Sequence, residues 1–195
     1  MSYLHRHIED IVERSFSTFK SVLVTGARQT GKSTLLDMNY PEVNKITFDD
    51  MFMEDQAKEN PDMFLSMNGI PLYLDEIQYV PSLFRYLKSH CDKNKVNGQY
   101  LLTGSQPFRL MEMASDSMAG RTAIIELATL SLREVFQSDF KTPFIPTPEY
   151  IQARKGTETK PDNIWQIIHR GMYRNSIQQF AQFVIGCHRP LAQCG

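Results

Sequence analysis

A glycine-rich turn between an apolar run and a helical segment constrains the fold of this 195-residue chain more than any other feature. The apolar run covers residues 21–25, the turn covers residues 26–34, and helical spacing continues with Leu35 and Leu36. Gly26 to Ser33 fits the pattern G-x-x-x-x-G-K-[ST] in the strand–loop–helix context that a phosphate-binding loop requires. The stretch therefore predicts a nucleotide site on an α/β fold.

The residue types in this loop suit a polyphosphate. Gly26 and Gly31 can adopt positive φ and let the backbone approach an anion closely. The backbone amides of residues 30–34 would then point at phosphate oxygens from a helix N-terminus, where the helix dipole favours negative charge. Lys32 is expected to reach the β- and γ-phosphates, and the Ser33 hydroxyl to ligate Mg²⁺. The residues expected to bind the nucleotide are Gly26, Ala27, Arg28, Gln29, Thr30, Gly31, Lys32, Ser33 and Thr34.

A second apolar run ends in two adjacent carboxylates. Residues 70–74 are almost continuously apolar, as in a parallel strand covered on both faces, and Asp75 and Glu76 follow directly. A carboxylate at the end of a buried strand is costly unless a cation pairs with it. Because Mg²⁺ is the natural candidate, we expect Asp75 to hold the ion, directly or through water, in a Walker B role. Glu76 would face the γ-phosphate and polarise the attacking water.

The other segments alternate between helical and strand patterns. Apolar spacing, caps and prolines predict helices over residues 3–19, 51–58, 61–67, 82–93, 107–113, 130–136 and 164–169. Strands are expected over residues 45–48, 99–102 and 122–127, with a loop over residues 115–121. Three prolines between residues 143 and 148 predict a stiff extended connector.

Several polar residues at predicted strand ends are further candidates. Ser105 follows the strand at 99–102, where it either senses the γ-phosphate or holds the attacking water, or simply begins a polar loop. Arg121 precedes the last strand and is either a surface charge or reaches a γ-phosphate in its own or a neighbouring subunit. Asp49 and Asp50 follow another strand, and such a pair more often caps the next helix than contacts a nucleotide.

Charge and composition narrow the class of protein. The formal net charge of -1, from 21 basic and 22 acidic residues, gives no support for a nucleic-acid-binding surface over the whole molecule, although a local basic patch stays open. The three cysteines lack paired spacing, which suits a reducing compartment. No apolar run approaches the length of about eighteen residues that a membrane span needs, and acidic residues near the N-terminus argue against a signal peptide. We therefore expect a cytoplasmic protein without membrane contact.

Five motifs in a fixed order give a resemblance to a known family. They are the loop at 26–33, Leu-Asp-Glu-Ile-Gln at 74–78, Leu-Thr-Gly-Ser at 102–105, Ser-Met-Ala-Gly-Arg at 117–121 and Leu-Ser-Leu-Arg-Glu at 130–134. Over residues 1–172 the chain resembles the bacterial and archaeal P-loop ATPases of the AAA_14 type, which usually carry a DUF4143 domain. The resemblance implies an α/β P-loop NTPase of the ASCE and AAA-like kind. Its fold would be a three-layer αβα sandwich whose mostly parallel sheet has an inserted strand between the P-loop strand and the Walker B strand.

The resemblance also implies roles for particular residues and a division of the chain. Glu76 would be the catalytic carboxylate, Ser105 would lie near the sensor position, and Arg121 would be a candidate arginine finger. Residues 1–140 would form the ATPase core with its N-terminal helix, 141–174 a linker and the start of a helical C-terminal region, and 175–195 a divergent tail. Because Arg174 stands where the family's turn has proline, and the resemblance ends there, we expect a truncated member without its C-terminal domain.

The leading functional hypothesis is an Mg²⁺-dependent ATPase whose hydrolysis of ATP drives a conformational switch. One alternative is a non-hydrolysing ATP-binding module that regulates or contacts a partner. A second alternative, a small-molecule P-loop kinase, is less expected because Asp75 and Glu76 at a strand end favour water over a substrate hydroxyl as the acceptor. Association with further copies of the chain stays open, as does a DNA or protein partner bound through the missing C-terminal domain.

Overall fold

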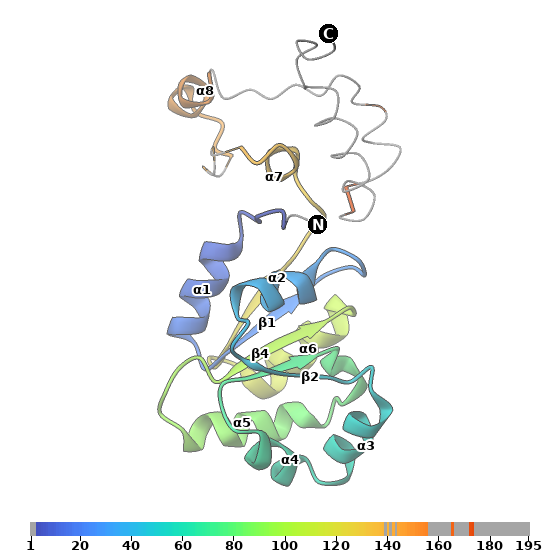
Figure 1. The fold of residues 1–195 in the computed structure, drawn as a ribbon. Coiled ribbons are helices and arrows are strands. Elements are labelled where there is room, and N and C mark those ends of the chain that lie inside the picture. Colours follow the sequence, from blue (N-terminus) through green and yellow to red (C-terminus); the bar gives the residue numbers. More distant parts are fainter. Residues whose placement is uncertain are drawn as a thin grey trace. The chain divides into compact units, whose positions relative to one another are not determined.

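The computed structural model describes residues 3–138, 140, 142, 144–155, 165, 172 and 173. The chain divides into two compact units (Figure 1). One comprises residues 8–128, and the other comprises residues 1–7 together with 129–195. The boundaries predicted at residues 140 and 174 differ from this division and stay predictions about domain organisation.

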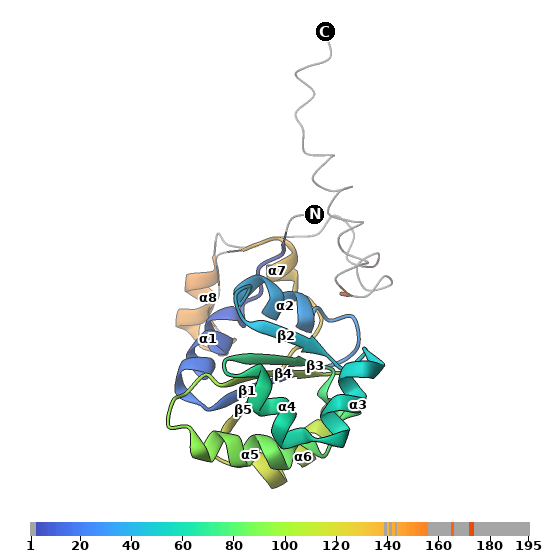
Figure 2. The same cartoon turned by 60° about the horizontal axis from the view of Figure 1, so that its bottom comes forward.

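The larger unit is built on a five-stranded sheet in which every strand pair is parallel. Its strands are β1 (Ser21–Thr25), β2 (Asn44–Thr47), β3 (Leu72–Asp75), β4 (Tyr100–Gly104) and β5 (Thr122–Glu126). The spatial order is β2-β3-β4-β1-β5 (Figure 2). Because β4 lies between β1 and β3, the inserted strand that the resemblance implied is confirmed.

One helix precedes the first strand of this sheet, and the other helices connect successive strands. They are α1 (Glu9–Thr18), α2 (Lys32–Asn39), α3 (Met51–Glu59), α4 (Pro61–Asn68), α5 (Leu83–Lys93) and α6 (Pro107–Met118), with the 3₁₀ turn η1 (Ile77–Tyr79). The side chain of Asp50 caps α3 by accepting the Phe52 amide at 2.9 Å, and Asn60 caps α4 ahead of Pro61. The capping role expected for Asp50 is therefore the one the structure shows.

Apolar side chains alternate between the two faces of the sheet and pack each face against helices. In β1, Leu23 belongs to one apolar cluster, whereas Val22 and Val24 belong to the other. The cluster around Leu23 includes side chains from α3, α4, α5 and α6, and the cluster around Val22 includes side chains from α1 and α2. Figure 1 shows these two groups of helices on opposite sides of the strands. The predicted three-layer αβα sandwich is confirmed.

Two helix boundaries differ from the sequence prediction by several residues, and at α6 the reason is burial in the core. The loop expected over residues 115–121 is helical as far as Met118, since Leu110, Ala114 and Met118 bury one face of α6 in the core. The first helix begins only at Glu9, not at residue 3. Among the described residues, no helix is both long and apolar enough to cross a membrane.

The smaller unit contains the short helices α7 (Leu132–Val135) and α8 (Pro148–Arg154). The Ser131 side chain accepts the Glu134 amide and Glu134 returns a bond to the Ser131 amide, which makes a capping box at the start of α7. The proline connector predicted before residue 148 ends where Pro148 begins α8, with Thr147 as its cap. The predicted helix at 164–169, apart from Trp165, and the predicted tail at 175–195 lie outside the described residues.

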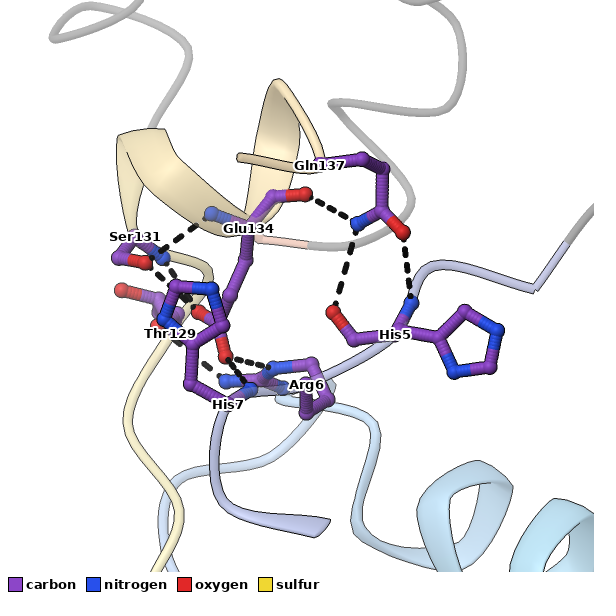
Figure 3. A network of polar contacts seen from close by, with 7 residues as sticks. All are labelled: His5, Arg6, His7, Thr129, Ser131, Glu134 and Gln137. Carbon is purple, nitrogen blue, oxygen red and sulfur yellow. Dashed lines mark hydrogen bonds and ion pairs between the residues drawn. The ribbon is translucent and has the colours of Figure 1, made fainter. Parts of the chain in front are cut away.

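The buried carboxylate of Glu134 gathers polar groups that are distant in the sequence, and we call this group the Glu134 network (Figure 3). Its Oε1 accepts the Arg6 guanidinium and the His7 backbone amide, both at 2.9 Å. Its Oε2 accepts the amide and hydroxyl of Ser131 at 2.8 and 3.0 Å. The Gln137 side chain bonds to both the backbone amide and the carbonyl of His5. Residues 5–7 are thus fixed within this unit by side chains at the ends of α7.

Candidate nucleotide-binding site

The loop between β1 and α2 has the backbone conformation that its glycines predict. Gly26 has φ +142°, and a β-carbon there would clash with the backbone carbonyl of Leu127, so no larger residue fits. Gly31 caps α2 with φ +93°, and Gln29 also has positive φ. Residues 27–29 form an exposed tip ahead of the N-terminus of α2. A turn of this kind leaves the first amides of the helix directed at the space above the end of β1.

Lys32 is folded back over this loop. Its Nζ donates to the carbonyl oxygens of Gly26 and Ala27 at 3.1 and 2.8 Å, and the residue is only 5% exposed. Burial lowers the pKa of Lys32, and the nearby carboxylates of Glu76 and Asp75 oppose that shift. A cation held by two neutral carbonyls can exchange them for stronger anionic acceptors. The position of Lys32 over the loop therefore fits the binding of a phosphate group.

Asp75 lies at the carboxyl end of β3 and joins that strand to the loop. Its Oδ1 accepts the Ser33 hydroxyl at 3.0 Å and the Tyr73 hydroxyl at 3.1 Å, together with the Thr103 hydroxyl from β4. On the other side, Lys45 Nζ lies 3.8 Å from Asp75 Oδ2. A carboxylate beside a serine hydroxyl supplies the hard oxygen ligands that Mg²⁺ prefers. Ser33 and Asp75 therefore fit the expected metal pair.

Glu76 follows in an unusual conformation. Its φ and ψ of 56° and 45° are left-handed, which non-glycine residues rarely adopt, and its side chain is partly exposed. The turn directs the chain into η1, where Gln78 donates from Nε2 to the Glu76 carboxylate and to Ser105 Oγ. The structure therefore brings Glu76 together with Ser105 at the end of β4.

Arg121 is not part of this assembly. Its carbonyl accepts the amide of Ser21, so it lies at the amino end of β1, about 15 Å from the loop at the usual strand rise. Its guanidinium forms a bidentate ion pair with Asp92 of α5, at 2.6 and 3.1 Å. This bond raises the pKa of Arg121 and lowers the pKa of Asp92. A contribution of Arg121 to phosphate chemistry would have to come from another copy of the chain.

The remaining loop residues differ in what they contact. Thr30 Oγ1 donates to the Ala27 carbonyl at 2.9 Å and closes the turn, whereas Arg28 is exposed. Thr34 lies in the first turn of α2 and is partly buried. Over the described part of the chain, no group of three His, Cys, Asp or Glu side chains is arranged as a metal site.

Sequence reasoning missed two neighbours of the carboxylates. Lys45, opposite Tyr73 in the β2–β3 pairing, bonds to Asp37 at 2.7 and 2.9 Å and lies over the Tyr73 ring. Gln78 is almost wholly buried, and its only signal in the sequence was a polar residue within the Leu-Asp-Glu-Ile-Gln motif. Lys45 reaches the site because β2 pairs with β3, and Gln78 reaches it because of the turn η1. Neither the pairing nor the turn can be inferred from the spacing of residues in the sequence.

Several solved structures superpose on this chain at low sequence identity. A DNA replication initiation factor superposes with a TM-score of 0.50 at 15% identity, over 91% of this chain and 58% of that one, a likeness that concerns the fold alone. DnaA of Aquifex aeolicus bound to AMPPCP gives a TM-score of 0.49 at 16% identity, over 91% of this chain and 59% of that one. A Walker-type ATPase of Pyrococcus abyssi gives 0.48 at 16% identity, over 69% and 56%.

Two curated relatives and one family match in sequence. Uncharacterised proteins of Mycobacterium bovis and Mycobacterium tuberculosis are each 35% identical over 119 residues, which is 60% of this chain. The match spans 27% of the length of each relative. The sequence signature of the AAA_14 family, described as an AAA domain, matches residues 18–136, which is more than half of the chain. The chain therefore belongs to the AAA_14 family and has the P-loop NTPase fold.

Proposed function

We propose that this chain binds ATP with Mg²⁺ at the loop of residues 26–34 and hydrolyses it, and that hydrolysis drives a conformational switch. The observation that carries the proposal is the 3.0 Å hydrogen bond between Ser33 of the loop and Asp75 at the end of β3. It joins a phosphate-loop hydroxyl to a buried carboxylate, with Glu76 next in the chain. This combination suits water attack on a phosphate more than simple anion binding.

Each residue has a distinct task in the proposed reaction. The amides of residues 30–34 would receive the phosphate oxygens, and Lys32 would leave the carbonyls of Gly26 and Ala27 to bind them. Mg²⁺, held by Ser33 and Asp75, would supply charge neutralisation on the β- and γ-phosphates. Glu76 would orient the attacking water and accept its proton.

The competing hypotheses make different demands on the same residues. A non-hydrolysing module needs the loop and Lys32 but not Glu76. The kinase alternative needs a pocket for an acceptor hydroxyl beside Asp75. Association with DNA, with another protein or with a second copy of the chain adds a partner to any of these functions and is tested separately.

The proposal is tested by comparing Lys32→Ala with Lys58→Ala. The Lys32→Ala variant lacks a charged hydrogen-bond donor worth about 1.5–3 kcal/mol, so its affinity for ATP should fall by about ten- to a hundredfold. Lys58 is an exposed lysine paired with Glu54 on α3, so its variant is the matched control and should bind normally. Calorimetric titration with ATP and Mg²⁺ measures both affinities. Equal affinities in the two variants would contradict the site assignment.

Phosphate release separates hydrolysis from binding. The wild-type protein should release phosphate from ATP with Mg²⁺ and stop when EDTA removes the metal. ATP binding without release would favour the non-hydrolysing module instead. Repeating the assay with duplex DNA measures whether that partner changes the rate.

A further inference from the structure

The side chain of Gln78 makes three hydrogen bonds, all of them to two residues of the proposed site. Its Nε2 donates to the Glu76 carboxylate and, at 3.3 Å, to Ser105 Oγ. Its Oε1 accepts the backbone amide of Ser105 at 3.3 Å. A carboxamide has two N–H donors, and both are engaged here. The side chain is 4% exposed, so water cannot easily replace these partners.

The surroundings of Gln78 are shaped to keep it in this place. A β-carbon at Gly104 would clash with Gln78 Oε1 and with Leu110, so the missing side chain at that position makes room for the carboxamide. On either side of Gln78 in the chain, Ile77 and Val80 are fully buried in the apolar core and anchor η1. The carboxamide is therefore held from the backbone side as well as by its hydrogen bonds.

The position of the Glu76 carboxylate depends on its hydrogen bond to Gln78. Its left-handed backbone turns the chain at the end of β3, and its amide donates to the Thr103 hydroxyl at 3.4 Å. Among the residues that the structure describes, Gln78 donates the hydrogen bond that the Glu76 carboxylate accepts. The same Gln78 amide nitrogen reaches the end of β4, which is the strand next to β3 in the sheet.

We infer that Gln78 is a positioning residue that couples the Glu76 carboxylate to Ser105. The inference rests on the proposed ATP hydrolysis, in which Glu76 activates water. The hydroxyl and the backbone amide of Ser105 both bond to Gln78, so a displacement of Ser105 moves the Gln78 carboxamide. Because the carboxamide also bonds to Glu76, the Glu76 carboxylate moves with it. Glutamate at position 78 would place a second carboxylate against Glu76, so the coupling requires a carboxamide.

Turnover kinetics test the coupling. Gln78→Ala should lower kcat by about ten- to a hundredfold, as expected for a misplaced catalytic group, with KM changed by less than about twofold. The isosteric variant Gln78→Glu should lower kcat by the same factor. It provides the test if the alanine variant folds poorly. Gln99→Ala is the matched control, because buried Gln99 donates to the carbonyls of Asn94 and Val96 at the other end of β4. A kcat for Gln78→Glu equal to wild type would overturn the inference.

A double variant separates positioning from structural support. If Gln78 acts through Glu76, adding Gln78→Ala to Glu76→Gln should leave the residual kcat unchanged. A further multiplicative loss would show that Gln78 acts independently of Glu76 and would overturn the inference.

A measurement that does not require ATP turnover tests the coupling through Gln78 separately from the proposed hydrolysis. In ¹⁵N–¹H spectra, the Gln78 side-chain amide signals, assigned by their loss in Gln78→Ala, should shift in both Glu76→Ala and Ser105→Ala. They should not shift in Lys58→Ala. Signals unaffected by Glu76→Ala or Ser105→Ala would refute the coupling, whereas absent ATP turnover in wild type with shifted signals would refute only the proposed hydrolysis.

Discussion

Replacing Glu134 by glutamine should release residues 5–7 from α7. The side chains of Glu134 and Arg6 are each 7% exposed, and the carboxylate binds the guanidinium at 2.9 Å (Figure 3). Breaking a buried ion pair by altering one partner costs about 3–5 kcal/mol. Glutamine keeps one acceptor oxygen, so we take the lower value of about 3 kcal/mol. This is equivalent to about a hundredfold change in the opening equilibrium of the segment.

Hydrogen exchange measures this opening directly. The amide of His7 donates to Glu134 Oε1, so its exchange rate reports the release of the segment. The rate should rise by about a hundredfold in Glu134→Gln. Glu112→Gln, a change of an exposed glutamate on α6, is the matched control and should leave the rate unchanged. A change of less than about threefold in Glu134→Gln would refute the argument that the buried charge holds residues 5–7.

The same network predicts a dependence on pH. Burial alone would raise the pKa of Glu134, but the amides of Ser131 and His7 and the charge of Arg6 together lower it below its ordinary value. A carboxyl whose pKa is lower in the folded state stabilises that state above its unfolded pKa, which is about 4.3 for glutamate. This contribution is lost as pH falls through the lower folded value. Protection of the His7 amide, corrected for intrinsic exchange, should therefore decline below about pH 4 in wild type but not in Glu134→Gln.

Two further predictions concern the proposed ATPase. Asp75→Asn should raise the Mg²⁺ concentration for half-maximal turnover by about tenfold or more, because an amide is a weaker ligand than a carboxylate, and an unchanged Mg²⁺ requirement would remove Asp75 from the metal site. If Arg121 acts on a neighbouring copy, activity per chain should rise with protein concentration, Arg121→Ala should abolish that rise and Asp92→Ala should retain it. Activity strictly proportional to concentration, from a species that sedimentation shows to be monomeric, would contradict this role for Arg121.

The fold was largely predictable because its main signals are local. Residues 21–36 carry a buried strand, a loop of suitable residue types and a helix start within one stretch, and β3 shows the continuous apolarity of a strand covered on both faces. The family resemblance implied a strand inserted between β1 and β3, but it did not place β2 and β5 at the edges of the sheet. The end of α6 was mispredicted because burial of Met118 against other helices extends it.

The side chains around the candidate site were harder to predict, since their neighbours come from other segments. Lys45 approaches Asp75 only because β2 pairs with β3, and Gln78 meets Ser105 only because β4 lies beside β3. In the smaller unit, Arg6 and Glu134 are 128 residues apart in the chain. No periodicity or motif indicates a pair at that separation, so the Glu134 network could be found only in the folded structure.

Single-turnover release of phosphate from Glu76→Gln tests the proposed function most directly. Glutamine keeps the size of the side chain but removes its basicity, so ATP affinity should stay within about threefold of wild type. The rate of phosphate release should fall by about a hundredfold or more, because the base that activates water is missing. An undiminished rate in Glu76→Gln would show that another group performs this step and would contradict the proposed mechanism.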